Sequence, residues 1–240
     1  LEQGKPLSDN RIAKLLLKRF SLDEPYGKSI KDKRGGDDNI HSWDIGIKGE
    51  TTKAERTLLD KMLTERRKKK WAERWGIEWM DGMPLSREMI ASFYQGKDLD
   101  KLLESLVKKR YLVYEHPKKR VTKKTEGGVS YSVREEDESK PQGYNIVAGK
   151  LSFDISKILD PNDVAPTLVA MDMNKLYVGD NGGLRRLTLR EGLRLFGYPE
   201  EYILGMSERE GYDLLGNTVV VPVIKAVAER LINVIRKQNN

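Results

Sequence analysis

The apolar residues of this chain are divided into short groups that charged and glycine-rich stretches separate. No apolar run approaches the roughly 20 residues that a membrane-spanning helix needs, and no signal peptide precedes the first polar segment. Hydrophobic residues make up 38% of the 240 positions, enough for the core of one large domain or two small ones. We therefore expect a globular protein in the cytoplasm, without a membrane partner.

Positive charge is concentrated in two segments of the chain. The net charge is +7, and residues 61–75 carry seven Lys or Arg against two Glu. Residues 101–124 carry nine Lys or Arg against two Glu. Clustered cations are typical of phosphate binding, so the sequence favours a nucleic-acid partner. The alternative is a basic face that only water covers.

The composition also limits the chemistry that the chain can perform. It contains no cysteine, which excludes disulfides, thiolate zinc sites and a thiol nucleophile. Its two histidines, His41 and His116, stand without a second histidine or a carboxylate at metal-ligand spacing. We interpret both as structural or surface residues and expect no metal site.

The N-terminal third has two regions of helical periodicity. Apolar residues predict a short helix over 8–20 and a long helix over 53–75. The polar, glycine-rich connector at 28–49 predicts a loop with one short strand near 43–47. The tryptophans of this region are interpreted as core residues and not as base-stacking platforms: Trp71, Trp75 and Trp79.

The next segment has the element order of a winged helix. Ser86 and Asp98 can each cap a helix, a strand is expected at 111–114, a basic turn at 117–120 and a second strand at 129–133. In such modules the second helix enters the major groove and the basic hairpin grips phosphates. This interpretation assigns six residues to the DNA backbone: Lys108, Lys109, Arg110, Lys118, Lys119 and Arg120. The alternative is a helical hairpin on a small sheet with solvated charges.

The acidic stretch 135–138 and the turn at 141–143 predict a boundary, after which the chain is poorer in charge. Short β-like runs follow at 144–147 and 168–170. An amphipathic helix is expected from about 222 to 237. Its apolar stripe consists of Val223, Ile224, Val227, Leu231 and Ile235.

Two segments near the C-terminus resemble signature motifs of the cytosine-C5 DNA methyltransferases. Residues 185–199, Arg-Arg-Leu-Thr-Leu-Arg-Glu-Gly-Leu-Arg-Leu-Phe-Gly-Tyr-Pro, are similar to the family's ninth motif. Gly216-Asn217-Thr218-Val219 with the following Val221-Pro222-Val223 is similar to the tenth. The tract 166–168, Pro-Thr-Leu, resembles the Thr-Leu pair of the family's target-recognition region. Leu189, Phe196 and Tyr198 depart mildly from the ninth motif, which affects fine packing only.

The resemblance implies a role for each segment. The ninth motif organises the target-recognition domain, and Thr188 can cap its helix while Leu193, Leu195 and Phe196 turn inward. Arg185 and Arg186 at its entry are expected to contact phosphate, and Thr167 to contact DNA. The tenth motif implies a turn beside an S-adenosylmethionine pocket. Its proposed cofactor-binding residues are Asn217, Thr218 and Val219, although Asn217 and Thr218 could instead cap the following helix.

The family's catalytic motifs are absent from this sequence: Pro-Cys, Glu-Asn-Val, Gln-x-Arg-x-Arg and the glycine-rich cofactor motif. The resemblance therefore covers the family's C-terminal half. It implies an α+β fold: a small target-recognition domain with a winged-helix-like section and a C-terminal helix that packs on an α/β catalytic domain supplied elsewhere. Four segments are expected, at 1–52 (helix and connector), 53–140 (winged-helix-like), 141–215 (target-recognition core with the ninth motif) and 216–240 (tenth motif and helix).

We expect the chain to recognise double-stranded DNA for a methyltransferase of a restriction-modification system. It has no catalytic residue of its own and needs an N-terminal catalytic half or subunit that bears a cysteine. The alternative is a non-enzymatic winged-helix regulator that binds DNA. That alternative explains residues 53–133 but gives no use to the two C-terminal motifs.

Overall fold

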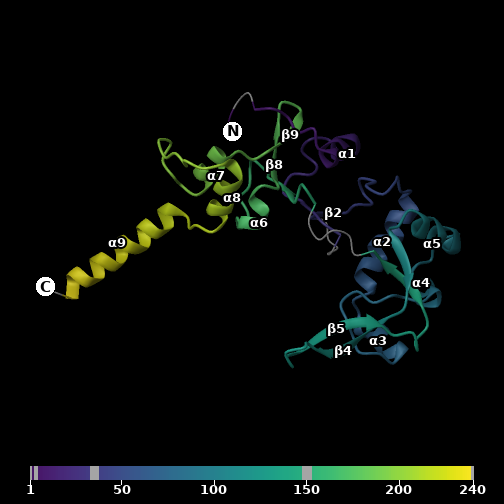
Figure 1. Cartoon of the computed structure of the whole chain (residues 1–240). Helices are drawn as coiled ribbons and strands as arrows, with labels where there is room; N and C mark the ends of the chain where they lie inside the picture. The colour runs from purple at the N-terminus through teal and green to yellow at the C-terminus, as the bar shows by residue number, and fades with distance from the viewer. Residues whose placement is uncertain (1, 3–4, 33–37, 148–152, 239–240) are drawn as a thin grey trace. The chain divides into compact units, whose positions relative to one another are not determined.

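The computed structural model of the chain describes residues 2, 5–32, 38–147 and 153–238, without the side chains of Met171 and Gln238 (Figure 1). The chain forms two compact units. The first unit contains Leu1–Ile30 and Ser152–Asn240, and the second contains Lys31–Leu151. The sequence placed its boundaries after residues 52, 140 and 215. In the structure the N-terminal segment instead joins the C-terminal part of the chain in one unit. One contact between them is the hydrogen bond from the amide of Ser8 to the carbonyl of Leu184, at 2.8 Å.

The first unit is built on a mixed sheet. Strands β1 (Ser29–Ile30), β7 (Lys157–Ile158), β8 (Leu176–Asp180) and β9 (Gly183–Arg186) lie in that order. β7 and β8 are parallel, while the β1–β7 and β8–β9 pairs are antiparallel. β8 and β9 are joined by a two-residue turn in which Asn181 and Gly182 both have positive φ, the geometry that matches strand twist.

The helices of the first unit are α1 (Arg11–Arg19), α6 (Ala170–Met173), α7 (Leu189–Leu195), α8 (Glu208–Gly216) and α9 (Val221–Gln238). α6, α7 and α8 cover the sheet next to β8 and β9 (Figure 1). The core between them consists of Met173, Leu176, Val178, Leu187, Leu193, Phe196, Tyr212 and Leu215. The predicted helices at 8–20 and 222–237 are confirmed as α1 and α9.

The second unit combines four helices with two-stranded antiparallel pairs. Its helices are α2 (Lys53–Glu65), α3 (Lys69–Trp75), α4 (Arg87–Phe93) and α5 (Leu99–Lys108). β3 (Leu112–Glu115) pairs with β6 (Gly143–Ile146), and β4 (Lys118–Lys124) pairs with β5 (Ser130–Glu136). The short strand β2 (Asn39–Ile40) precedes α2. The core includes Leu58, Leu59, Met62, Leu63, Met89, Ile90, Leu103 and Leu106.

Helix-capping signals were read correctly at α4 and only in part at α5. Ser86 accepts a hydrogen bond from the amide of Met89, as predicted. Asp98 occupies the N-cap position of α5, but it has φ 58° and its side chain accepts no capping hydrogen bond. The strand predicted at 144–147 is confirmed as β6.

The long helix predicted over 53–75 is wrong, because the chain turns at Arg66. The carbonyl of Arg66 accepts a hydrogen bond from the amide of Met83 at 3.0 Å, so it is not available to a continuing helix. Its buried guanidinium donates to Asn145 Oδ1 at 2.6 Å and to the carbonyl of Ile146 at 3.2 Å. Residues distant in sequence therefore divide the predicted helix into α2 and α3.

Three further predictions of local structure are also wrong. Residues 43–47 form turns, since Gly46 and Gly49 have positive φ and bend the chain. The basic stretch 117–120 is not a turn, because β4 begins at Lys118 and the hairpin reverses at 125–129. Residues 168–169 belong to no strand, and α6 begins at Ala170.

The tryptophans divide between core and surface. Trp71 is 3% exposed and Trp75 is partly buried against the same core, as predicted. Trp79 is 43% exposed, and its indole N–H donates to the carbonyl of Arg67 at 2.9 Å. The core assignment of Trp79 was therefore wrong.

A glycine allows α8 to pack directly on the N-terminus of α6. A Cβ on Gly216 would overlap the backbone of Ala170 and of Val169. We expect Gly216→Ala to lower the free energy of unfolding by about 3 kcal/mol or more, because a backbone overlap cannot be relieved by a rotamer change. Gly205→Ala is the matched control, since a Cβ there meets nothing within 4 Å. Urea unfolding followed by circular dichroism measures both, and equal midpoints for the two variants would contradict this packing.

Candidate functional site

The segment that resembles the ninth motif begins with a buried cation. Arg185 is 1% exposed, and its Nη1 and Nη2 donate to the two carboxylate oxygens of Glu191 at 2.9 and 2.8 Å. Its Nε donates to Asp180 Oδ2 at 2.7 Å. A charge this deeply buried is tolerated only when it is paired and hydrogen-bonded. The expected phosphate contact of Arg185 is therefore wrong, because this guanidinium is used entirely inside the protein.

Glu191 also fixes the start of α7. Its carboxylate accepts from the amide of Thr188 at 3.0 Å, and the Thr188 hydroxyl accepts from the amide of Glu191 at 3.1 Å. This reciprocal capping box confirms Thr188 as the predicted N-cap. Burial alone would raise the pKa of Glu191. The hydrogen bonds from Arg185, Thr188 and Glu2 outweigh burial and lower this pKa to about 2.

The remaining side chains of this segment divide between the surface and the core. Arg186 is exposed, and its contact with phosphate stays a prediction. Arg194 forms an exposed ion pair with Glu200 at 2.6 Å. Leu193 and Phe196 are buried as predicted, whereas Leu195 is 40% exposed and was wrongly placed in the core. Leu195 instead lines a pocket of about 300 Å³, to which Pro166 and Glu191 also contribute. Thr167, the expected DNA contact, is exposed next to Pro166.

The structure brings the two motif-like segments into direct contact. The amide of Val221 donates to the carbonyl of Phe196 at 2.9 Å. Gly197 has φ 75°, and a Cβ at this position would overlap the ring of Pro222. The hydroxyls of Tyr198 and Thr218 lie 3.1 Å apart. Segments about 20 residues apart therefore form one junction between α7 and the start of α9.

The proposed cofactor residues form the turn between α8 and α9. Asn217 is the C-cap of α8, and its side-chain Nδ2 donates to the carbonyl of Asp213 at 2.8 Å. It therefore caps the preceding helix, whereas the sequence suggested the following one. Val219 is 57% exposed. The turn presents Asn217 and Val219 to the surface, and Thr218 is partly buried.

The basic residues at the end of α5 do not act alike. Lys109 Nζ lies 2.7 and 2.9 Å from the carboxylate oxygens of Glu55, whose side chain is 2% exposed. Lys109 therefore neutralises a buried carboxylate and was wrongly assigned to DNA. Lys108 and Arg110 are exposed, as a contact with phosphate requires.

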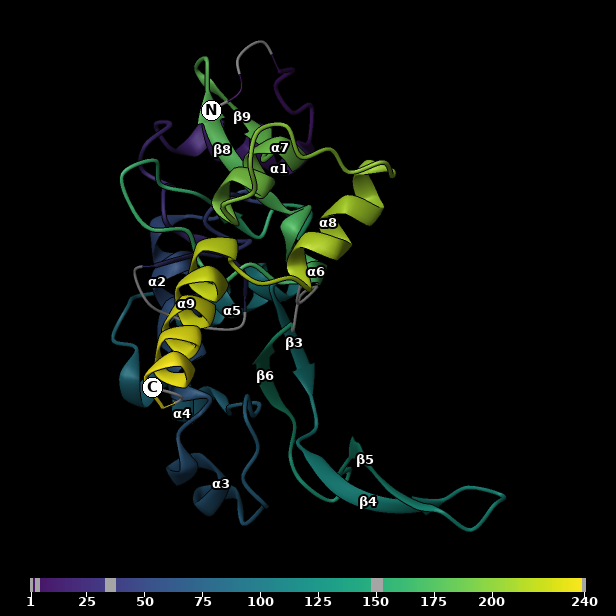
Figure 2. The ribbon, with the colours of Figure 1, turned by 90° about the vertical axis from the view of Figure 1, so that its left-hand side faces the viewer.

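The other basic residues lie on the antiparallel ribbon of β4 and β5. Lys118, Lys119 and Arg120 are all exposed on β4. Figure 2 shows the ribbon continuing beyond β3 and β6 as a two-stranded projection. The structure therefore presents these cations on an extended strand, where consecutive side chains point to opposite faces.

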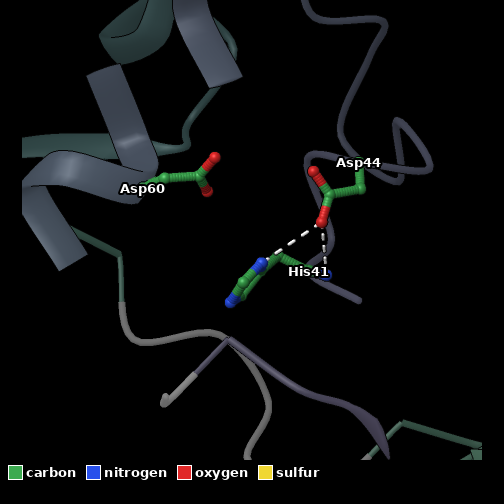
Figure 3. Close-up of side chains that lie close together, drawn as sticks. All are labelled: His41, Asp44 and Asp60. Carbon is green, nitrogen blue, oxygen red and sulfur yellow. Dashed lines mark hydrogen bonds and ion pairs between the residues drawn. The ribbon is translucent and has the colours of Figure 1, made fainter. Parts of the chain in front are cut away.

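The histidines have partners that the sequence interpretation missed. His41 Nδ1 lies 3.2 Å from Asp44 Oδ2, and Asp60 lies nearby (Figure 3). The statement that no carboxylate stands at metal-ligand spacing was therefore wrong for His41, since the spacing of three residues to Asp44 was visible. Asp60 accepts from the indole of Trp43 at 3.1 Å, and His41 stacks on Trp43. These contacts give the group a structural role. His116 Nδ1 lies 2.7 Å from the carbonyl of Lys140.

The chain is similar to several known proteins. Residues 39–233 match the family model described as C-5 cytosine-specific DNA methylase. The chain is 60% identical to the type II methyltransferase M.NlaIV of Neisseria lactamica and 58% identical to M.NgoBV of Neisseria gonorrhoeae. Each match covers 97% of this chain and 53% of the relative. M.BanI of Aneurinibacillus aneurinilyticus is 35% identical over 92% of this chain and 44% of its own length. The chain thus spans about half the length of these relatives.

Among the described residues, no helix has the length and apolar character needed to cross a membrane.

The Glu191 ion pair predicts a specific loss of stability in acid. The ordinary pKa of the Glu191 carboxyl group is 4.5, and its pKa in the folded chain is about 2. This difference corresponds to roughly 3 kcal/mol of folding free energy. Because the folded-state pKa is depressed, this contribution is present above pH 4.5 and is lost as pH falls towards 2. Glu191→Gln should destabilise the chain at pH 7 and flatten the decline between pH 5 and pH 3.

The exposed pair of Arg194 and Glu200 supplies the control. Glu200→Gln removes a carboxylate that is 62% exposed, so its effect on the urea midpoint should be small. The midpoint of each variant, measured by circular dichroism from pH 7 to pH 3, tests the assignment. An unchanged acid profile in Glu191→Gln would show that this carboxylate does not hold the depressed pKa.

Proposed function

Because the chain belongs to the C-5 cytosine-specific DNA methylase family, we propose that it is the DNA-recognising portion of a type II methyltransferase. In this proposal it binds a specific double-stranded sequence and positions a flipped cytosine. Other residues of the enzyme perform the methyl transfer. The methylation would serve a restriction-modification system, in agreement with the type II relatives.

One observation carries this division of roles: none of the 240 residues is a cysteine. An unactivated pyrimidine carbon is a poor nucleophile. Methylation at C5 therefore requires a thiolate that adds at C6 and a carboxylate that stabilises the ring nitrogen. The relatives are about twice as long as this chain. The thiolate would thus come from a catalytic half, on the same or another polypeptide, that this chain completes.

Exposed cations on both units support DNA binding. The clustered positive charge lies at the end of α5, on the β4–β5 ribbon and at the entry to α7, where side chains can reach phosphate. We propose that α4, α5 and the ribbon act in the manner of a winged helix within an α+β fold. The proposed contacts that the structure leaves exposed are Lys108, Arg110, Lys118, Arg120, Thr167 and Arg186. Lys119 is exposed as well, but it already forms an ion pair with Asp137 at 3.2 Å and is not among the proposed contacts.

The cofactor proposal rests on the turn between α8 and α9. Asn217 and Thr218 already bond to Asp213 and Tyr198 within the chain. These bonds hold the turn in place, and we propose that it forms one wall of an S-adenosylmethionine site, to which Asn217, Thr218 and the exposed Val219 contribute. The catalytic half would supply the remaining walls. S-adenosylmethionine provides the methyl group when it is bound.

α9 is the proposed contact with that catalytic half. Its described side chains are all exposed, and Val223, Ile224, Val227, Leu231 and Ile235 are each between 49% and 59% exposed. A continuous apolar stripe of this kind usually has a partner. A non-enzymatic DNA-binding regulator, the alternative function, gives this stripe no use.

The first test concerns binding and turnover. The purified chain should bind duplex DNA with an affinity that falls by more than about tenfold between 50 and 200 mM salt. It should incorporate no methyl group, because it has no thiolate. Fluorescence anisotropy and tritiated-methyl transfer measure the two properties, and reproducible methyl incorporation by the chain alone would refute the division of roles.

The second test concerns the stripe of α9. Val227→Asp with Leu231→Asp should abolish the activity that the chain restores to a cysteine-bearing catalytic half, because each buried carboxylate costs several kcal/mol. DNA binding by the chain should be nearly unchanged. The control, Lys225→Gln with Asn233→Asp, changes the net charge equally on the opposite side of the helix. Full activity of the double Asp variant in this complementation assay would exclude α9 from the contact.

A further inference from the structure

The β4–β5 ribbon has two faces of different character. Its register pairs Lys118 with Glu136 and Lys124 with Ser130. Side chains directly opposite each other in an antiparallel pair lie on the same face, and neighbours along a strand alternate between faces. We define the even face as Lys118, Arg120, Thr122, Lys124, Ser130, Ser132, Arg134 and Glu136, and the odd face as Lys119, Val121, Lys123, Tyr131, Val133 and Glu135.

The cations of the odd face already have acidic partners. Lys123 Nζ lies 2.5 Å from Glu135 Oε1, and Lys119 Nζ lies 3.2 Å from Asp137 Oδ1. The centre of this face is the apolar pair of Val121 and Val133, both half-buried. The odd face thus has paired cations and contains the apolar part of the ribbon.

The even face is arranged differently. All eight of its side chains are exposed, and four of them are cations against the single carboxylate of Glu136. Arg120 stands directly opposite Arg134, although like charges at paired positions destabilise a hairpin. Arg120 forms an ion pair with Glu78 at 3.8 Å, in which the two side chains are 58% and 65% exposed. Such an exposed pair offsets little of the repulsion.

Two further properties of the even face fit a DNA groove. The hydroxyls of Thr122 and Ser132 are directly opposite each other, adjacent along the ribbon to the arginine pair. Together they offer donors and acceptors of the kind that read base edges. A two-stranded ribbon also fits the width of the major groove, which is about 12 Å.

We propose that the ribbon does more than grip phosphates as a winged-helix hairpin does: its even face enters the major groove of DNA. In this arrangement Arg120, Arg134, Thr122 and Ser132 face the base edges, and Lys118 and Lys124 reach phosphates at the groove walls. The negative charge of the DNA offsets the repulsion between Arg120 and Arg134. Lys119, although it lies between Lys118 and Arg120 in sequence, points away from the bases. The inference rests on the proposed DNA-binding function and assigns its specificity to one face.

The test compares two charge-matched double variants of the full 240-residue chain. Arg120→Ala with Arg134→Ala removes two cations from the even face, and Lys119→Ala with Lys123→Ala removes two from the odd face. The probes are a 24-base-pair duplex selected by the unaltered chain from a randomised pool and a scrambled duplex of the same composition. Fluorescence anisotropy gives the affinity of each protein for both.

The even-face variant should bind the selected duplex at least about tenfold more weakly and lose most of its preference over the scrambled duplex. The odd-face variant should bind each duplex within about threefold of the unaltered chain and keep the preference. Thr122→Ala with Ser132→Ala retains every charge and should still reduce the preference. The melting temperature of the even-face variant should not fall, because its repulsion has been removed.

Several outcomes would overturn the proposal. Equal losses in the two charge-matched variants would mean that the ribbon only supplies general attraction. An even-face variant that weakens both duplexes equally would indicate phosphate contact without base reading. Retained affinity and preference in that variant would remove the even face from the interface. If the unaltered chain bound no duplex at all, the proposed DNA-binding function itself would fail. The three outcomes named above would leave that function intact.

Discussion

The carboxylate of Glu191 is the group on which the first unit depends most. It pairs with Arg185 at the end of β9, caps α7 through Thr188 and accepts from the backbone amide of Glu2 at 2.7 Å. A strand, a helix and the N-terminal segment therefore meet at one buried side chain. Residues 185–199 are rich in charge and yet form part of the scaffold, because the cation of Arg185 and the carboxylate of Glu191 neutralise each other away from solvent. α7 in turn holds the junction of Phe196 and Gly197 with Val221 and Pro222, from which α9 begins.

Local signals allowed part of this structure to be predicted. The capping pair of Thr188 and Glu191, the cap at Ser86 and the periodicity of α9 all act within one or two turns of a helix, so the sequence shows them directly. The wrong predictions arose where contacts between residues distant in sequence determine the structure. Arg66 interrupts a regular helical pattern because its partners are 79 and 80 residues away. Lys109 looked like a DNA contact because Glu55, its partner, is 54 residues distant.

The candidate site shows the same limit. Arg185 and Arg186 are indistinguishable in sequence, yet one is 1% exposed and the other is at the surface. Lys118, Lys119 and Arg120 form one basic cluster in sequence, and only the register of β4 with β5 separates Lys119 from its neighbours. Spacing identifies which residues could bind DNA. Burial and strand register determine which of them are available to do so, and from which side.

The central claim is that this chain chooses the DNA target while other residues of the enzyme carry out the chemistry. Its most direct test is a hybrid methyltransferase that joins this chain to the catalytic half of a relative whose methylated sites differ from those of the chain's own enzyme. Bisulfite sequencing of DNA exposed to the hybrid maps the methylated cytosines. The account predicts that the sites follow the parent that supplies this chain. Sites that follow the parent of the catalytic half would contradict it.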